Sequence, residues 1–488
     1  MKLTGVERRV LPSMSPNYDI LRINGQDQQK ASQELAEMIE IFLSPLLIVL
    51  DRILDKRLVR TLVQCCVAII RFRHNKQGLL LSELGSYMDG YSGLSTNAPA
   101  GTKRLGNLIR SIKWSIFHID QYILDEADKE VKSLRILGKR VLCIWDGSVI
   151  EKPESSKLEG LAPVLSSKAK RLNRSRRGLV FNMPAAKPIM VMGMQWTGVL
   201  IAGTEGIVKI AAMSWWTTKG DYAVKQREQE ENMLRKIVRK WGDTLIHVFD
   251  RGYSSGPWLR LLRELRVKFV IRWKKDHFFR DKNGNEKKLW QIGYGKKYLA
   301  HKLVYDIHTG VKMQCDIWWA PVRHDSYGEQ LYLVKIRLKK QVMYVITNEQ
   351  IKTELDAWDI VFTYRRRWQI ELSFRYGKCE LAMESPRLWS FENRLKLLGL
   401  VTLVYAFLLH LLSPLYKETV QSVLRLKCHR TGKRCRDVIA PLYRLRWAIS
   451  RLWGDSPPAL GRFFPPDLAT IRVLASFKCE IGFPKNSG

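Results

Sequence analysis

The segment TYRRRWQIELSFRYGKCEL, residues 363–381, decides how the rest of the chain is interpreted. At ~100° per residue, a helix brings five of its polar side chains into an arc of about 80°. They are Tyr364, Arg367, Glu371, Arg375 and Lys378, with Trp368 at their border. One carboxylate among three cations and a phenol suits a surface where Glu371 holds a metal ion and its neighbours hold phosphates. The alternative is a solvated helix face with ion pairs between residues four apart.

Two aspartates each follow an apolar run that predicts a buried strand. KRVLCIWD (139–146) ends in Asp146, and LIHVFD (245–250) ends in Asp250. A single acidic residue in such a place often only caps a turn. If the two strands are neighbours, however, both carboxylates meet at one sheet edge and can share a hard divalent cation. With Glu371 they make three carboxylates, which suffice for two metal ions that activate water without a histidine base.

The remaining pattern predicts a multidomain α/β protein. Helical spacing dominates both ends, strands and helices mix in the middle, and short strands follow one another closely from 274 onward. We expect a helical N-terminal DNA-binding region (1–125), the first part of a catalytic core (126–273), an all-β insertion (274–350), the second core part with the Glu371 helix (351–416) and a basic helical C-terminal region (417–488).

Charge and composition limit the classes of molecule that this protein is expected to bind. The 488 residues carry a formal net charge of +35, and a hydrophobic content of 46% is typical of a globular protein rather than a disordered one. Such an excess of cations favours a polyanionic partner, first of all nucleic acid. Basic runs at 102–114 and 166–178 are candidate DNA contacts or simply solvated surface, and the basic cluster at 425–436 is a candidate for dimerisation or DNA binding. A basic RNA-binding structural protein would explain the charge but not the motif around Glu371.

Nothing in the sequence requires a membrane or a structural metal. The apolar run 397–412 is shorter than the roughly 20 residues of a spanning helix, so we expect a buried core helix. The first 20 residues lack the apolar run of a secretion signal, and the eight cysteines are scattered, which fits a reducing cytoplasm. We therefore expect a cytoplasmic protein without a membrane partner.

The spacing Y-x2-R-x3-E-x6-K is met in full by Tyr364, Arg367, Glu371 and Lys378. It resembles the signature of insertion-sequence transposases of the DDE class, of the IS-four type. The resemblance covers roughly residues 139–416 and includes Asp250 in a DRGY context, with a β-rich stretch before the glutamate. It implies an RNase H-like mixed-sheet catalytic core that carries an inserted all-β module.

The resemblance also implies roles for single residues. Asp146, Asp250 and Glu371 would be the catalytic metal ligands for Mg²⁺, two ions per site, with Mn²⁺ as a substitute. Residues that would contact DNA are Tyr364, Arg367 and Lys378 at the terminal phosphate, Arg375 by its place on the helix, Arg251 beside the second aspartate, and Trp368 and Tyr344 as stacking partners of a flipped base. The last pair is implied only for relatives that excise through a DNA hairpin, and Tyr344 matches imperfectly.

The expected function follows from these roles. A transposase of this type cuts and joins phosphodiester bonds at insertion-sequence ends, binding terminal inverted repeats and target DNA as a homodimer on paired ends. It would work at the nucleoid of a bacterium. Two alternatives remain at this point: a transposase-derived DNA-binding protein without catalysis, and another RNase H-like nuclease that needs the acids but not Tyr364 and Lys378.

Overall fold

A computed structural model describes most of the chain. It covers residues 25–72, 78–88, 98–155, 157–166, 189–305, 311–339, 341–427 and 442–458. Of the basic runs named above, 167–178 and 428–436 lie outside the described residues. The run at 102–114 falls mostly on a helix, α4, which ends at Arg110.

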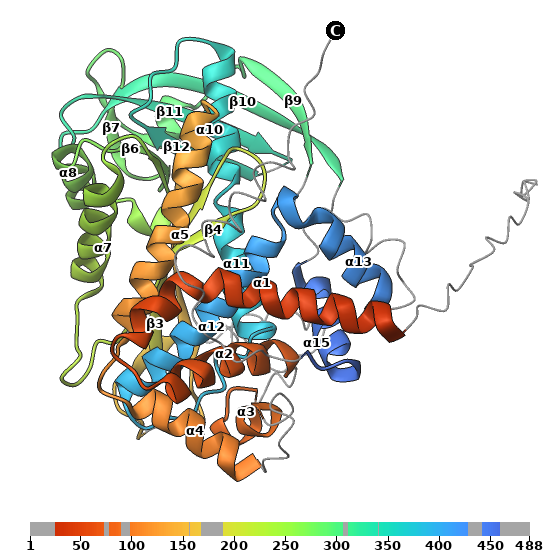
Figure 1. The fold of residues 1–488 in the computed structure, drawn as a ribbon. Helices are drawn as coiled ribbons and strands as arrows, with labels where there is room; N and C mark the ends of the chain where they lie inside the picture. Colours follow the sequence, from red (N-terminus) through yellow and green to blue (C-terminus); the bar gives the residue numbers. More distant parts are fainter. Residues whose placement is uncertain are drawn as a thin grey trace, which may run out of the picture.

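One mixed sheet forms the centre of the molecule (Figure 1). Within the described residues its strands are β1 (Leu142–Glu151), β2 (Ala162–Leu165), β3 (Met190–Ala202), β4 (Lys209–Trp216), β5 (Ile246–Phe249), β6 (Lys268–Trp273), β7 (Phe278–Arg280), β8 (Glu286–Lys288), β9 (Ala300–Tyr305), β10 (Lys312–Arg323), β11 (Gln330–Leu338) and β12 (Gln341–Thr347). Their order is β2-β3-β1-β5-β6-β12-β11-β10-β7-β8, with β4 on β3 and β9 on β10.

The strands pair in two modes. β1, β3 and β4 form an antiparallel group, whereas β5 runs parallel to β1 and β6 runs parallel to β5. The strands from the expected β insertion then continue the same sheet, because β12 pairs antiparallel with β6. Parallel neighbours need long crossover connections, and helices after β4 and β5 supply them.

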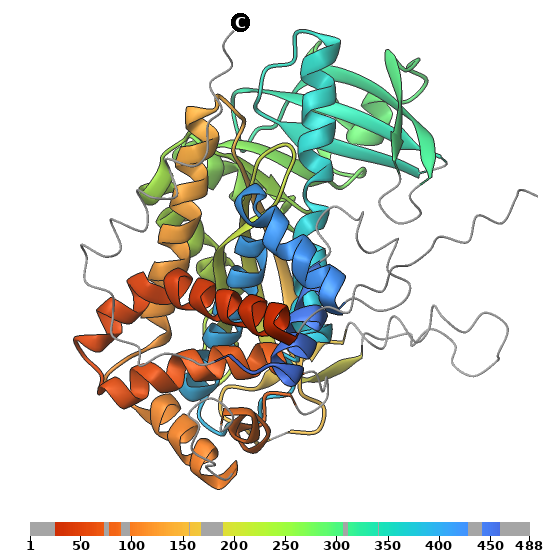
Figure 2. The same cartoon turned by 45° about the vertical axis from the view of Figure 1, so that its right-hand side comes forward.

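Helices cover both faces of this sheet. The elements are α1 (Gly25–Asp51), α2 (Lys56–Arg71), α3 (Leu81–Met88), α4 (Ala98–Arg110), α5 (Ile116–Ile136), α7 (Gln226–Trp241), η2 (Arg251–Tyr253), α8 (Gly256–Glu264), α9 (Leu289–Ile292), α10 (Glu354–Arg365), α11 (Trp368–Cys379), α12 (Phe391–Leu411), η3 (Pro414–Tyr416), α13 (Lys417–Lys427) and α15 (Leu442–Asp455). In Figures 1 and 2, α1 to α4 gather at one end of the molecule and β7 to β12 at the other.

Alternation along the strands separates two apolar clusters. Leu142 and Ile144 of β1 face the cluster that contains α10, α11 and α12. Cys143 and Trp145 face the opposite cluster, which contains residues of α5, α7 and α8. Since successive side chains of a strand point to opposite faces, Asp146 belongs to the α11 side.

The long apolar helix is α12. By length and composition it is the one described helix that could cross a membrane, and 83% of its most apolar stretch is buried inside the protein. It belongs to the same apolar cluster as α2 and α5. This is the packing of a core helix, as the sequence predicted.

Two expectations about local structure were wrong. The first strand does not end at Asp146, because β1 continues to Glu151 and pairs with β3 throughout. The helix around Glu371 is also not uniform: α10 ends at Arg365 and α11 begins at Trp368. Between them the amide of Arg367 bonds to the carbonyl of Tyr364 and that of Ile370 to Arg367, a tighter three-residue spacing.

Candidate functional site

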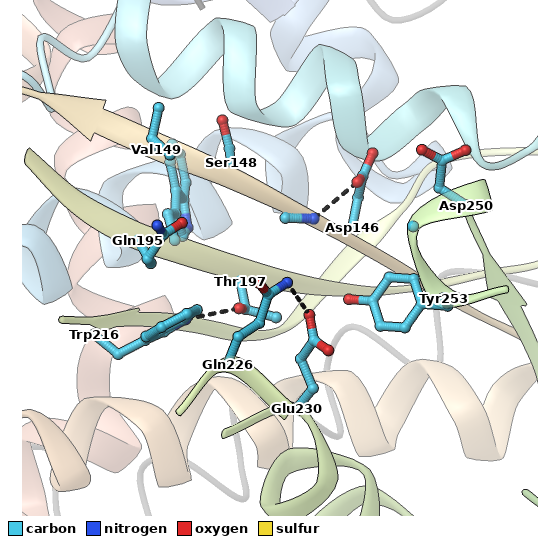
Figure 3. Close-up of a pocket in the computed structure, with 13 residues that line it drawn as sticks. Asp146, Ser148, Val149, Gln195, Thr197, Trp216, Gln226, Glu230, Asp250 and Tyr253 are labelled. Carbon is cyan, nitrogen blue, oxygen red and sulfur yellow. Dashed lines mark hydrogen bonds between the residues drawn. The ribbon is translucent and has the colours of Figure 1, made fainter. Parts of the chain in front are cut away.

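The two aspartates lie at one edge of the sheet. β1 and β5 are parallel neighbours, with Ile144 opposite Val248. Two residues further along each strand, this register sets Asp146 level with Asp250, which directly follows β5 and caps the short helix η2. The prediction that the two strands are adjacent is therefore correct, and Figure 3 shows both carboxylates on the same side of a cavity.

Glycines let α11 approach β1 and β3 closely. Gly198 pairs with Asp146 across the β1–β3 ladder, and a Cβ there would lie 2.9 Å from the ring of Phe374 in α11. On α11 itself, a Cβ at Gly377 would lie 2.8 Å from the ring of Trp196. The Phe374 and Trp196 rings meet edge to face, 4.6 Å apart. This close packing carries Glu371 to the strand that holds Asp146.

Arg367 joins two of the three acids. Its Nη1 donates to Oδ2 of Asp146 over 2.9 Å, and its Nη2 donates to Oε1 of Glu371. The Arg367 side chain is only 10% exposed, so solvent screens these ion pairs weakly. Its guanidinium also lies 5.9 Å from the centre of the Tyr364 ring. The arginine and tyrosine of the motif thus meet the glutamate and the first aspartate in space.

The electrostatics reflect this crowding. Burial, together with the charges of Asp250 and Glu371, raises the pKa of Asp146 to about 7, although Arg367 and the amide of Gly147 act in the opposite direction. Burial lowers the pKa of Arg367, but Tyr364 and the three acids raise it to a net increase. Burial also raises the pKa of the Tyr364 phenol. Asp146 therefore carries a proton more readily than an exposed aspartate unless a cation neutralises it.

A polar cavity of about 260 Å³ opens beside the aspartates. Asp146 and Asp250 line it together with Glu230 of α7, Tyr253 of η2 and Thr197 of β3 (Figure 3). Burial raises the pKa of Glu230 as well, against hydrogen bonds from Gln226 and Arg227. The cavity gives a substrate phosphate and its water a place next to the acids.

The other residues predicted on this helix face lie in different surroundings. Lys378 is half-buried on α11, two turns beyond Glu371. Arg375 is exposed and lines a separate cavity of about 940 Å³ with Leu372, Tyr376 and Cys379. The structure therefore places Arg375 toward a different hollow from the one beside Asp146.

The two residues predicted to stack on a flipped base, Trp368 and Tyr344, lie in different surroundings. Trp368 is half-buried at the start of α11. Tyr344 is 9% exposed in β12, where it pairs with Lys335 of β11 and Trp273 of β6. Arg251 is exposed in the turn immediately after Asp250. Of these three, only Arg251 adjoins a residue that lines the polar cavity.

The acids fit a hard divalent cation by their donor chemistry. Carboxylate oxygens are the ligands that Mg²⁺ prefers. The charges of Asp250 and Glu371 both raise the pKa of Asp146, so the three acids interact electrostatically. Among the described residues, however, no group of three or more His, Cys, Asp and Glu side chains is arranged as a metal site. The bonds from Arg367 hold Asp146 and Glu371 on the guanidinium instead.

Glu230 is the functional candidate that the sequence interpretation missed. It sits in QREQEENMLRK, where the other two glutamates, Glu228 and Glu231, are exposed and half-buried, respectively. A signal was present, because Glu230 is three and seven residues before Met233 and Ile237 and so lies on the apolar face of α7. An acidic residue on such a face requires a partner or a function.

A family model matches part of this chain. Residues 221–407 match the family model described as the transposase DDE domain. The match includes Asp250 and the whole motif from Tyr364 to Lys378, and Asp146 precedes it. This match supports the prediction of a DDE-type transposase domain in this region of the chain.

Among curated proteins no sequence matches the chain. A solved structure titled "Cryo-EM structure of piggyBac transposase synaptic complex with hairpin DNA (SNHP)" is similar at 13% identity and a TM-score of 0.32. The similarity covers 75% of this chain and 64% of that one, which is less than two thirds of that chain's length.

Proposed function

We propose that this protein cuts and joins DNA phosphodiester bonds at the ends of an insertion sequence, in cut-and-paste transposition. Asp146, Asp250 and Glu371 are its catalytic acids. The observation that carries the proposal is the bridge from Arg367 to Asp146 and Glu371, which brings together residues from β1 and α11 inside a transposase DDE domain. Asp250 reaches the same place through the parallel register of β1 and β5.

The catalytic core is RNase H-like in this proposal. The support is the antiparallel group β4-β3-β1 followed by parallel β5 and β6, with α11 packed on β1. The core comprises residues 126–273 and 351–416, and the strands of 274–350 are an insertion that extends its sheet. The regions 1–125 and 417–488 flank it and contact DNA.

The acids hold Mg²⁺, two ions per site, and Mn²⁺ can replace it. Such ions activate a water or 3′-hydroxyl and stabilise the leaving oxygen. Arg367 keeps Asp146 and Glu371 at a defined separation and has further N–H groups with which to bind a phosphate. Tyr364 packs beside Arg367 and limits its freedom, while Lys378 and the exposed Arg251 hold neighbouring phosphates.

The substrate is double-stranded DNA: terminal inverted repeats first, then target DNA. The net charge of +35 favours such a partner. A homodimer on paired ends, each subunit cutting one end, is part of the proposal, as is a location at the bacterial nucleoid. Excision through a hairpin, with Trp368 and Tyr344 stacking on a flipped base, is its least supported element, because the two side chains lie in different surroundings.

Replacing Glu371 by Ala tests the site assignment. The DNA flanking the coding region supplies the candidate inverted repeats, which are made as labelled duplexes. With Mg²⁺, we expect the natural protein to nick and release these ends on a denaturing gel, and E371A to bind them in a gel shift without cutting. The same gel separates hairpin ends from nicked ends. Nicked ends alone would refute excision through a hairpin.

A control variant and three contrary outcomes make this test decisive. Glu264 is an exposed glutamate of α8 whose carboxylate pairs with Arg235 at the surface, so E264A should cut normally. Unchanged metal-dependent cleavage by E371A would overturn the assignment. End binding without cleavage by the natural protein would favour a DNA-binding protein that has lost catalysis, and cleavage independent of Tyr364 and Lys378 would favour another RNase H-like nuclease.

A further inference from the structure

Glu230 is a buried acid that the proposed chemistry does not use. Its side chain is 2% exposed, yet it lines the same cavity as Asp146 and Asp250. A carboxylate in such a place is costly unless donors compensate it. The groups that donate hydrogen bonds to the Glu230 carboxylate therefore indicate its role.

Two donors to Glu230 come from α7, and one of them, Arg227, also bonds to the turn after Asp250. Gln226 Nε2 and Arg227 Nη1 each donate to Glu230 over 2.9 Å. Arg227 Nη2 also donates to the carbonyl of Gly252 over 3.0 Å. Glu230 thereby orients the arginine that holds the backbone of the η2 turn.

One aromatic side chain of this turn and one of α8 also contact Arg227. The Arg227 guanidinium lies 5.5 Å from the centre of the Tyr253 ring and 5.4 Å from that of Trp258. Figure 3 shows the Tyr253 hydroxyl directed toward Glu230, on the opposite side of the ring from its attachment near Asp250. Arg227 thus contacts the turn through the Gly252 carbonyl and the Tyr253 ring, and it contacts α8 through the Trp258 ring.

The geometry of Asp250 depends on that turn. Asp250 is its first capping residue, and its carbonyl accepts a hydrogen bond from the amide of Tyr253 over 3.1 Å. Gly252, the residue that Arg227 holds, has no side chain to pack and is exposed. Without Arg227, the turn would lose its link to α7, and the Asp250 carboxylate would lose its fixed direction.

We infer that Glu230 is a positioning residue: it holds Arg227 on the η2 turn and so sets the affinity of Asp250 and Asp146 for a divalent cation. This rests on the proposed function, in which Asp250 is a metal ligand. Partners that orient metal ligands typically contribute ~10–100-fold to metal affinity. Glu230 acts through Arg227 and Asp250 and need not contact the DNA.

Replacing Glu230 by Gln tests the inference with little change of shape. We expect the Mg²⁺ concentration for half-maximal end cleavage to rise ~10-fold or more in E230Q. Mn²⁺ binding followed by electron paramagnetic resonance should weaken by a similar factor without DNA, while end binding in a gel shift stays unchanged. Saturating Mn²⁺ should restore most of the cleavage rate.

Two further variants show whether the effect passes through the proposed contacts. R227Q changes a side chain that is 47% exposed, so it tests the same link even if E230Q does not fold. The double variant should be no worse than the more affected single one, because both break one chain of contacts. E231Q is the matched control: this neighbour pairs with Arg235 at the surface and should change nothing.

The outcomes separate this inference from the function on which it rests. If D250N abolishes cleavage while E230Q and R227Q keep the natural metal dependence, the inference is wrong and the proposed function stands. If D250N itself cuts normally, the proposed function fails. Additive losses in the double variant would show that Glu230 acts without Arg227 and would also overturn the inference.

Discussion

Arg367 is the residue through which the acids of the site are connected. It bonds to Asp146 on β1 and to Glu371 on its own helix, and it packs on Tyr364. A guanidinium offers two parallel donors in a fixed plane, which a lysine ammonium does not. The motif spacing therefore has a physical reason. Glu371 lies four residues after Arg367, where Nη2 of the guanidinium reaches it, while Nη1 reaches Asp146 on the sheet.

Replacing Arg367 by Lys should keep the charge and lose this bridge. Hydrogen bonds to charged groups contribute about 1.5–3 kcal/mol each, so we expect end cleavage to fall roughly 10–100-fold. End binding should change little, because the positive charge remains. Single-turnover cleavage of labelled ends measures the rate. R263K, an exposed arginine of α8, is the control, and a natural cleavage rate in R367K would contradict the bridging role.

At the level of elements, the site depends on how closely α11 lies on the sheet. Phe374 covers Gly198, which is the ladder partner of Asp146, and Gly377 faces Trp196. Trp196 is 1% exposed and also stacks on Trp215, so its ring has little room to move. The tight turn between α10 and α11 then sets Tyr364 and Arg367 relative to Glu371.

Gly377→Ala should separate α11 from β3. The new Cβ would lie 2.8 Å from both the Trp196 ring and the flexible Met383 sulfur, and the ring must shift. Overpacking of this kind costs about 1–3 kcal/mol, so thermal unfolding should begin at a lower temperature. Cleavage should fall further than stability explains, because Glu371 moves with its helix.

The matched control for this change is Gly454→Ala. Gly454 is also helical, in α15, and nothing lies within 4 Å of its Cβ position. This variant should unfold at or slightly above the natural temperature, since alanine favours helices. An unchanged unfolding temperature and cleavage rate in G377A would show that the close approach of α11 is not required.

At the scale of the whole molecule, the sheet topology brings the two aspartates together and the net charge favours a polyanionic partner. The proposed catalytic residues come from distant parts of the chain: the parallel pairing of β1 and β5 brings Asp146 and Asp250 to one edge of the sheet, and α11 carries Glu371. The helical end of the molecule and the strands β7 to β12 lie on either side of this centre (Figures 1 and 2). The net charge of +35 over the whole chain favours association with a polyanion such as DNA.

End binding should therefore depend steeply on salt. If 6–10 phosphates are neutralised, affinity should fall roughly 10³–10⁵-fold between 50 and 200 mM salt. Fluorescence anisotropy with labelled ends measures this slope, and E371A should show the same slope as the natural protein. A nearly flat salt dependence would contradict the proposed DNA contacts.

The sequence by itself predicted the two aspartates beside apolar strands and the grouping of Tyr364, Arg367, Glu371 and Lys378, because these depend on local periodicity and on residues at fixed spacing. The enzyme class was predicted from the resemblance of that spacing to the DDE transposases. Only the tertiary structure decided that Arg367 bridges Asp146 and Glu371, that Arg375 turns toward a different cavity, and that Glu230 joins the acidic site. Ideal helix geometry predicted one arc for five residues, but a tightened turn and the packing of Gly377 on Trp196 set the real directions. Glu230 resembled its exposed neighbours in sequence, and its burial arises from the contact between α7 and the turn after Asp250.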